Sequence, residues 1–162
     1  MTSSTQTTPA NAGVRFPPPF LFAGGFLAGW LLHRTWPLHV FGASLAGIRP
    51  WLGWLLLVAG LVLMLSGLVT FLRAHTAVIP HHPATRLVTT GPYRFTRNPM
   101  YLGLTLAYLG GVVLVDSFWP LLILPVVLLV LTAAVIRREE RYLAAAFGDA
   151  YNAYCRRVRR WL

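Results

Sequence analysis

The sequence predicts an all-α protein, a polytopic membrane helix bundle of about four transmembrane helices followed by an amphipathic C-terminal helix. The chain of 162 residues is 56% hydrophobic and only 11% charged, with a mean hydropathy of +0.61. It also contains long runs without a charged residue, which soluble domains of average composition lack. From residue 137 onward the pattern becomes charged with helical periodicity, which predicts the final surface helix.

Four apolar runs are free of Lys, Arg, Asp and Glu: residues 16–32, 50–72, 99–115 and 118–136. A membrane-spanning helix needs about 20 such residues, so the second run is long enough and the first and third are short. Four spans are therefore expected. The apolar segment 38–48 is too short to cross, and a re-entrant or surface position for it stays open.

The runs divide the chain into three parts. Residues 1–15 form a polar leader that is expected to be disordered and that lacks the features of a cleavable signal peptide. Residues 16–72 hold the first two spans and the segment that connects them. Residues 73–162 form a core with a polar loop, two further spans and the C-terminal helix.

The charge distribution predicts the orientation in the membrane. The net charge of +10 comes from 14 arginines against four acids. With four spans, twelve arginines fall on the side of both termini, and the opposite side holds Arg34 and Arg49. By the positive-inside rule both termini are expected in the cytoplasm, in an inner or plasma membrane. The arginines adjoin bilayer spans, which argues against nucleic acid as a partner.

Small residues recur at helix-packing intervals inside the spans. Lipid-embedded helices associate where small side chains let their backbones approach closely, so these rows are the expected helix contacts. The rows are Gly25 and Gly29 in the first span, Gly53, Gly60 and Gly67 in the second, and Gly103, Ala107 and Gly111 in the third.

Metal binding and disulfides receive little support from the sequence. Cys155 is the single cysteine, so no disulfide within the chain and no multi-cysteine metal site is expected. His75, His81 and His82 lie in a Pro-containing loop without neighbouring cysteines or carboxylates. A metal-handling or small transport protein using these histidines is therefore a weaker alternative, and no metal is expected.

The stretch GPYRFTRNPMYLG, residues 91–103, places Arg94 and Arg97 at the start of the third span. Asn98 followed by Pro99 is a helix-start signal, with Asn as the cap. A helix N-terminus carries partial positive charge, so guanidinium groups beside it need an anion. The candidates are a lipid phosphate, the carboxylate of a bound small molecule, and the acidic pair Glu139 and Glu140.

The C-terminal segment predicts a basic amphipathic helix that lies on the membrane or caps the bundle. One stripe contains Glu140, Leu143, Phe147, Tyr151, Tyr154 and Val158. Gly148 is expected to interrupt the helix, so the stripe is predicted to hold only through Phe147. Glu140 lies on this stripe and needs a partner, whereas Glu139 is rotated off it.

These two segments together resemble a family. The first is similar to the motif of membrane methyltransferases related to isoprenylcysteine carboxyl methyltransferase and phospholipid methyltransferases, which runs Gly-Pro-Tyr, Arg-His-Pro, then Tyr and Gly. The second, EERYLAAAFGDAYNAYCRRVRRWL, matches the Glu pair and the aromatic positions that follow. The resemblance covers the chain from about Thr76 onward. Asn98 stands where the isoprenylcysteine enzymes have His.

The resemblance implies that residues 73–162 are a methyltransferase core that binds S-adenosylmethionine at the cytoplasmic end of the last spans. The implied catalytic residues are Arg97, Asn98 and Glu140. The implied cofactor-binding residues are Gly91, Tyr93, Arg97, Asn98, Pro99, Tyr101, Glu139 and Glu140.

Possible roles follow from the chemistry of these side chains. Arg97 suits the carboxylate of the cofactor, and Glu140 suits its ribose hydroxyls or its sulfonium. Tyr93 or Tyr101 suits adenine or the cation. The expected partners are the bilayer and a lipophilic or lipid-like acceptor, whose reacting group is a carboxylate, a thiol or an amine. A catalytically silent binding or sensor relative is the alternative.

Overall fold

The computed structural model of the chain describes residues 17–41, 45–74 and 86–162. Within these ranges the chain is helical and has no strand, which confirms the predicted all-α class. The predicted disordered leader and part of the segment 38–48 lie outside the described residues. The elements are α1 (Pro18–Thr35), α2 (Arg49–Arg73), the 3-10 helix η2 (Gly91–Arg94), α3 (Pro99–Val115), α4 (Phe118–Leu131), the π-helical turn η3 (Thr132–Ile136) and α5 (Arg137–Arg157).

The four predicted apolar runs coincide with α1, α2, α3 and the continuous stretch of α4 and η3. By length and composition, α2 and the continuous helix Phe118–Arg157 are long and apolar enough to cross a membrane. The apolar part of the second ends at Ile136, because α5 begins with two arginines and two glutamates. Helix α3 is a shorter apolar helix. The protein is thus a membrane helix bundle, and the crossing of α1 and α3 stays a prediction.

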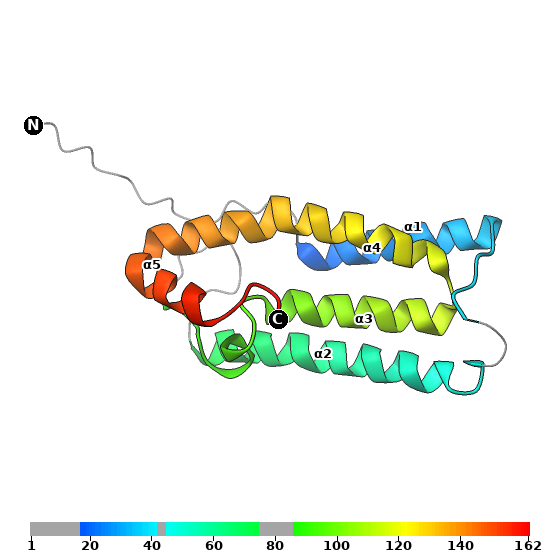
Figure 1. Ribbon diagram of the computed structural model, residues 1–162, viewed down its shortest axis with the longest axis horizontal. Helices are drawn as coiled ribbons and strands as arrows, with labels where there is room; N and C mark the ends of the chain where they lie inside the picture. Colours follow the sequence, from blue (N-terminus) through cyan, green and yellow to red (C-terminus); the bar gives the residue numbers. More distant parts are fainter. Residues whose placement is uncertain (1–16, 42–44, 75–85) are drawn as a thin grey trace, which may run out of the picture.

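The helices lie side by side in two pairs, α2 with α3 and α1 with α4 (Figure 1). The first pair is joined by glycines. A Cβ added at Gly60 would lie 2.4 Å from the Ala107 nitrogen and 2.5 Å from the Gly103 oxygen. The second pair is equally close, because a Cβ at Gly29 would lie 2.5 Å from the Pro120 backbone. The predicted packing role of these residues is confirmed, and it reflects association by backbone approach in lipid.

One residue of the predicted small-residue rows faces a different neighbour. A Cβ at Gly111 would meet the Phe26 ring of α1 at 2.8 Å, whereas Gly110 faces α2 across from Gly53 and Leu57. Gly111 is therefore a helix contact as predicted, but its contact is with α1 and not with α2. Residues eight positions apart on a helix differ by about 80° in direction, which is enough to change the facing helix.

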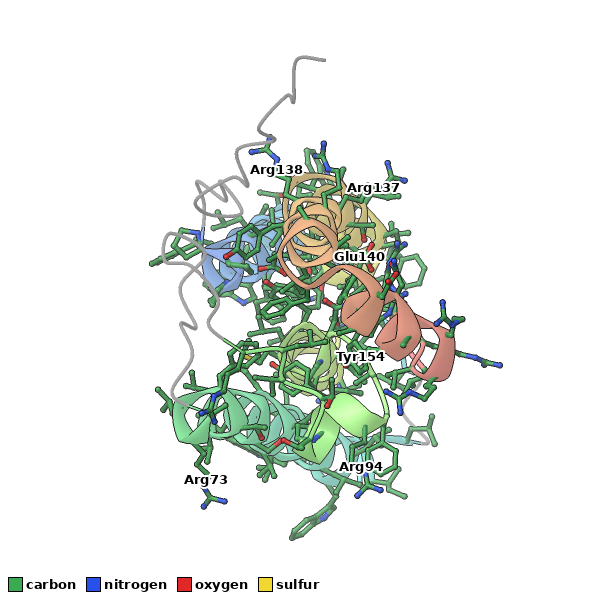
Figure 2. All side chains as sticks on the ribbon, turned by 90° about the vertical axis from the view of Figure 1, so that its left-hand side faces the viewer. Arg73, Arg94, Arg137, Arg138, Glu140 and Tyr154 are labelled. Carbon is green, nitrogen blue, oxygen red and sulfur yellow. The ribbon has the colours of Figure 1, made fainter. Side chains whose placement is uncertain are left out.

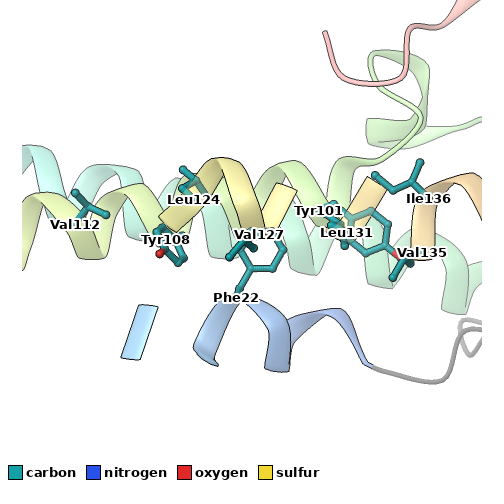
Figure 3. Packing of buried hydrophobic residues seen from close by; sticks show 9 residues of the cluster. All are labelled: Phe22, Tyr101, Tyr108, Val112, Leu124, Val127, Leu131, Val135 and Ile136. Atoms are coloured by element: carbon teal, nitrogen blue, oxygen red, sulfur yellow. The ribbon is translucent and has the colours of Figure 1, made fainter. Parts of the chain in front are cut away.

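Buried side chains join the two pairs along the middle of the bundle (Figure 3). Tyr108 of α3 donates a hydrogen bond to the Pro120 carbonyl at 2.8 Å, and its ring meets the Phe26 ring edge-on. Leu131 and Ile136 have no exposed surface. The core thus continues through the π-helical turn η3 to the end of the bundle where α5 begins.

The opposite end is fastened by Asp116, which follows α3 with φ of 51°. Aspartate tolerates this left-handed conformation better than most residues. Its carboxylate accepts hydrogen bonds from the amides of Val40 and Phe41 and from Arg49 Nη1 at 2.6 Å. Burial alone would raise the pKa of Asp116, but these contacts hold it below its usual value. One carboxylate therefore ties the segment after α1, the start of α2 and the α3–α4 turn together.

Candidate functional site

The motif segment that precedes α3 is folded against the end of α2. Gly91 has φ of +58°, and a Cβ there would lie 2.9 Å from Thr70 Oγ1, so this position requires glycine. The 3-10 helix that follows buries Tyr93, whose ring meets the Phe71 ring edge-on. The Tyr93 hydroxyl has no hydrogen-bond partner among the described residues. Burial raises the pKa of Tyr93 far above its ordinary value, so its hydroxyl keeps its proton and remains a donor.

Asn98 and Pro99 begin α3 as predicted, but the capping role predicted for the Asn98 side chain is wrong. Asn98 makes no side-chain cap. Its Nδ2 donates to the Arg160 carbonyl at 2.9 Å, and Thr96 Oγ1 donates to the same carbonyl at 3.1 Å. The Arg97 amide donates to the Arg159 carbonyl at 2.9 Å. The polar atoms of the motif therefore hold the segment after α5 in place, and this long-range contact competes successfully with local capping.

Helix α5 bends back over this end of the bundle, and the labelled side chains of Arg137 and Arg138 lie at its start (Figure 2). The predicted interruption at Gly148 is confirmed by its φ of 50°. The apolar stripe nevertheless continues beyond Phe147, because Tyr151, Tyr154 and Val158 form a buried cluster against which Phe147 packs. Tyr154 also donates a hydrogen bond to the Tyr93 carbonyl at 2.8 Å. The bend at Gly148 redirects the second half of the helix onto the motif segment.

Glu140 and Arg97, which are 43 positions apart in the sequence, meet at this end with Nη1 and Oε1 3.2 Å apart. Arg160 binds the same carboxylate with two nitrogens, at 2.9 and 2.7 Å. Such a fork is among the strongest hydrogen-bonded ion pairs in proteins. Arg97 Nη1 also lies 2.9 Å from Cys155 Sγ, while Arg97 Nε is buried without a partner among the described residues.

Glu139 has a different environment from its neighbour. As predicted, it is rotated off the stripe that holds Glu140, and its Oε1 accepts a hydrogen bond of 2.7 Å from the Tyr101 hydroxyl of α3. The reason is that two helix faces are covered here, one by α3 and one by the segment after α5. Burial raises the pKa of Glu139 to about 7, against the opposing effect of the Tyr101 hydrogen bond. Glu139 lies in α5, beyond the apolar segment that ends at Ile136.

The structure brings the predicted residues of both motifs to one end of the bundle. Two pairs are in direct contact, Arg97 with Glu140 and Tyr101 with Glu139. Pro99 is fully buried at the start of α3. The sequence did not predict the contacts that four other residues make at this end of the bundle: Thr96, Tyr154, Cys155 and Arg160. Arg160 in particular is one arginine among several in the sequence, and only its position after the bend distinguishes it.

No group of three or more His, Cys, Asp or Glu residues that could hold a metal occurs in the part of the chain that the structure describes. His75, His81 and His82 lie outside that part, so the alternative that depends on them has no structural description here.

The sequence pattern of the phospholipid methyltransferase family matches residues 48–150, well over half of the chain. The chain belongs to this family. The match includes α2, which the motif resemblance left out, together with the first motif and the Glu pair. The family assignment agrees with the convergence of the two motifs at one end of a membrane helix bundle.

Several curated proteins are similar to parts of the chain. Protein-S-isoprenylcysteine O-methyltransferase of Schizosaccharomyces pombe is 38% identical over 72 residues, which are 44% of this chain and 30% of that protein. The cobalt-zinc-cadmium resistance protein CzcN of Cupriavidus metallidurans is 38% identical over 72 residues, 44% of this chain and 33% of that protein. An uncharacterized protein of Haemophilus influenzae is 40% identical over 63 residues, 39% of this chain and 79% of that protein. The similarity thus spans about a third of the first two relatives.

Proposed function

We propose that the protein is an integral membrane methyltransferase that uses S-adenosylmethionine as methyl donor and methylates a lipophilic or lipid-like acceptor. Membership of the phospholipid methyltransferase family supports the reaction class. The observation that carries the proposal for the donor is Arg97, which is partly buried at the meeting point of both motifs and retains an unpartnered Nε among the described residues.

The side chains at this end fit the donor group by group. The donor carries a carboxylate, a sulfonium and a nucleoside. Because Arg160 already binds both oxygens of Glu140, the charge of Arg97 is only partly balanced and suits the carboxylate. Glu139, which has no cationic partner among the described residues, suits the neighbourhood of the sulfonium. Tyr93 offers a buried hydroxyl donor without a partner among the described residues.

In such a reaction the protein's own residues mainly position the reactants and exclude water. The donor, when bound, supplies a methyl group on an activated leaving group. Arg97 binds and orients its carboxylate, which converts the encounter with the acceptor into a step of fixed geometry. The buried tyrosines and the segment after α5 exclude water from the reacting groups. Asn98 holds that segment and so acts as a positioning residue, because its amide is already engaged with the Arg160 carbonyl.

Calorimetric titration of the protein in lipid nanodiscs with S-adenosylmethionine and S-adenosylhomocysteine tests the proposal. Saturable binding is expected for the wild-type protein. Arg97→Gln should weaken it by about tenfold or more, as expected for loss of a charged hydrogen bond. The matched control is Arg94→Gln, an exposed arginine of the same segment, which should change the affinity by less than about twofold. Absence of saturable binding to the wild-type protein would refute the proposal.

The orientation is part of the proposal. With four spans, twelve arginines would lie on the side of both termini and of the motif residues, so we place this end of the bundle in the cytoplasm, where the donor is made available. Labelling of Cys155, the single cysteine, with a membrane-impermeant thiol reagent checks this placement. Labelling in inside-out vesicles but not in right-side-out vesicles is expected, and the reverse would overturn it.

A silent binding relative remains the second candidate, and the commitment of the Asn98 amide to the Arg160 carbonyl favours it. Asn98→His tests it by restoring the residue of the isoprenylcysteine enzymes. Transfer of labelled methyl groups into extracted lipids by the wild-type protein would show that it is catalytically active and would exclude this candidate. Transfer only by the Asn98→His variant would support it.

A further inference from the structure

The two adjacent carboxylates at the start of α5 have partners of opposite character. Glu140 is bound by Arg160 through both oxygens and by Arg97 through one. Glu139 has one polar partner among the described residues, the neutral hydroxyl of Tyr101. Consecutive residues of a helix point about 100° apart, so one carboxylate reaches the segment after α5 and the other reaches α3.

This difference decides which carboxylate is free to take up a proton. Protonation of Glu140 would remove the charge that holds two guanidinium groups together, and a broken partly buried ion pair is costly. Protonation of Glu139 breaks no ion pair with a residue that the structure describes, and the Tyr101 hydrogen bond survives it because the hydroxyl still finds an acceptor oxygen. Glu140 therefore serves as a clamp, and Glu139 is the carboxylate of the pair with capacity for proton transfer.

The surroundings of Glu139 favour the same role from every side that the structure describes. Tyr101 approaches from α3, Tyr93 from η2 contributes an uncharged phenol nearby, and Glu140 is the adjacent charge on α5. The raised pKa of Glu139, about 7, arises from burial among these groups. A general base works best when its pKa is near the pH at which it operates.

We propose that Glu139 is the proton acceptor of the methyl transfer and that the methyl acceptor therefore reacts through a nucleophile that carries a proton, an amine or a thiol. This inference rests on the proposed function and narrows its acceptor. The lone pair of the nitrogen or sulfur forms a bond to the methyl carbon, and the carbon–sulfur bond of the donor breaks with its electron pair on sulfur. The proton of the nucleophile passes to the Glu139 carboxylate and from there to water. A carboxylate acceptor would have no proton to lose.

Three acceptors with the same alkyl chain isolate the reacting group: dodecylamine, dodecanethiol and dodecanoate. The wild-type protein in nanodiscs with labelled S-adenosylmethionine should methylate the amine or the thiol, and dodecanoate much more slowly. Glu139→Gln should lower turnover of the amine or the thiol by about a hundredfold, within the usual range for loss of general-base catalysis. It should also abolish the acidic limb of the pH–rate profile. Methylation of dodecanoate as the preferred acceptor, or a Glu139→Gln variant with unchanged turnover and pH profile, would overturn the inference.

A second readout does not depend on turnover. Infrared spectra of the wild-type protein, recorded from about pH 5 to about pH 9, should show a protonated carboxyl band that disappears near neutral pH. The band should be absent in Glu139→Gln and unchanged in Asp149→Asn, an exposed acid of the same helix. A band that persists in Glu139→Gln, or no titration near neutral pH, overturns the inference whether or not any of the three acceptors reacts. Binding of S-adenosylhomocysteine to the wild-type protein, measured in parallel, reports separately on the proposed function.

Discussion

The two ends of the bundle use carboxylates in different ways. At one end Asp116 is surrounded by two backbone amides, Arg49 and His39, so all of its bonding capacity goes into joining three segments. At the other end Glu140 is similarly clamped by Arg97 and Arg160. Its neighbour Glu139 has only a neutral hydroxyl as a partner among the described residues. A carboxylate whose partners are all charges or amides fastens the fold, whereas one left without a cation is available for chemistry.

The largest effect on stability is expected for Asp116→Ala. It leaves Arg49 and two amides without their acceptor at an 11% exposed side chain, and loss of one partner of a buried ion pair costs about 3–5 kcal/mol. Asp116→Asn isolates the loss of the charge, because asparagine keeps an acceptor oxygen and tolerates the positive φ. Its loss of stability should be clearly smaller than that of Asp116→Ala. Thermal unfolding in detergent measures both. The affinity of the remaining folded protein for S-adenosylhomocysteine should not change. A loss of affinity would show that the two ends of the bundle do not act independently.

Glu140→Gln should have the next largest effect, and it should affect both stability and binding. The variant places two guanidinium groups together without a charge between them, at a cost of about 2–3 kcal/mol for these partly exposed groups. Because Arg97 is displaced from its position, affinity for S-adenosylhomocysteine should also fall. Asp149→Asn serves as the control and should stay within about 0.5 kcal/mol of wild type. Unchanged affinity in Glu140→Gln would mean that the clamp does not position Arg97.

Asn98→Ala tests how the segment after α5 is held. It removes the hydrogen bond from Nδ2 to the Arg160 carbonyl but leaves the Thr96 hydroxyl as a second donor, so a loss of about 1 kcal/mol is expected. The double variant with Thr96→Val should lose more than the sum of the two single changes, because the part-buried Arg160 carbonyl then has no side-chain donor from this motif. Additive losses in chemical unfolding would show that the two donors act independently.

An effect on stability that depends on pH is expected for Glu139→Gln. The pKa of Glu139 is raised from 4.5 to about 7, so the folded state binds the proton more tightly than the unfolded state. The stability this gives is present below about pH 4.5 and is lost as the pH rises through about 7. The variant, which cannot ionise, should be closest to wild type below about pH 4.5 and be more stable near pH 8.5 by about 2–3 kcal/mol, or about 4–12 °C. A difference that does not change with pH would contradict the burial of this carboxyl.

The sequence predicted the helices well and the contacts of the motif less well. The ends of α3, Pro99 and Val115, coincide with the predicted run, because composition and the Asn-Pro start signal act locally. The sequence predicted the contact between Arg97 and Glu140 only as one of several possible anionic partners for the arginines at the start of α3. The cap by Asn98 was predicted wrongly, and the segments that Glu139 and Gly111 contact were not predicted, since each depends on which segment packs against that face.

Composition and periodicity alone established an all-α membrane bundle with its glycine-rich helix contacts, because hydrophobic length and small-residue spacing follow from the lipid environment and not from any partner segment. The resemblance of the two motifs also indicated the family from the sequence alone, since a motif is defined by the order of residues and does not depend on the fold. The tertiary structure decided which of the two carboxylates is clamped and which has no cationic partner among the described residues. That outcome depends on the bend at Gly148 and on the return of Arg160 to the motif, and both bring together residues that no local pattern in the sequence connects.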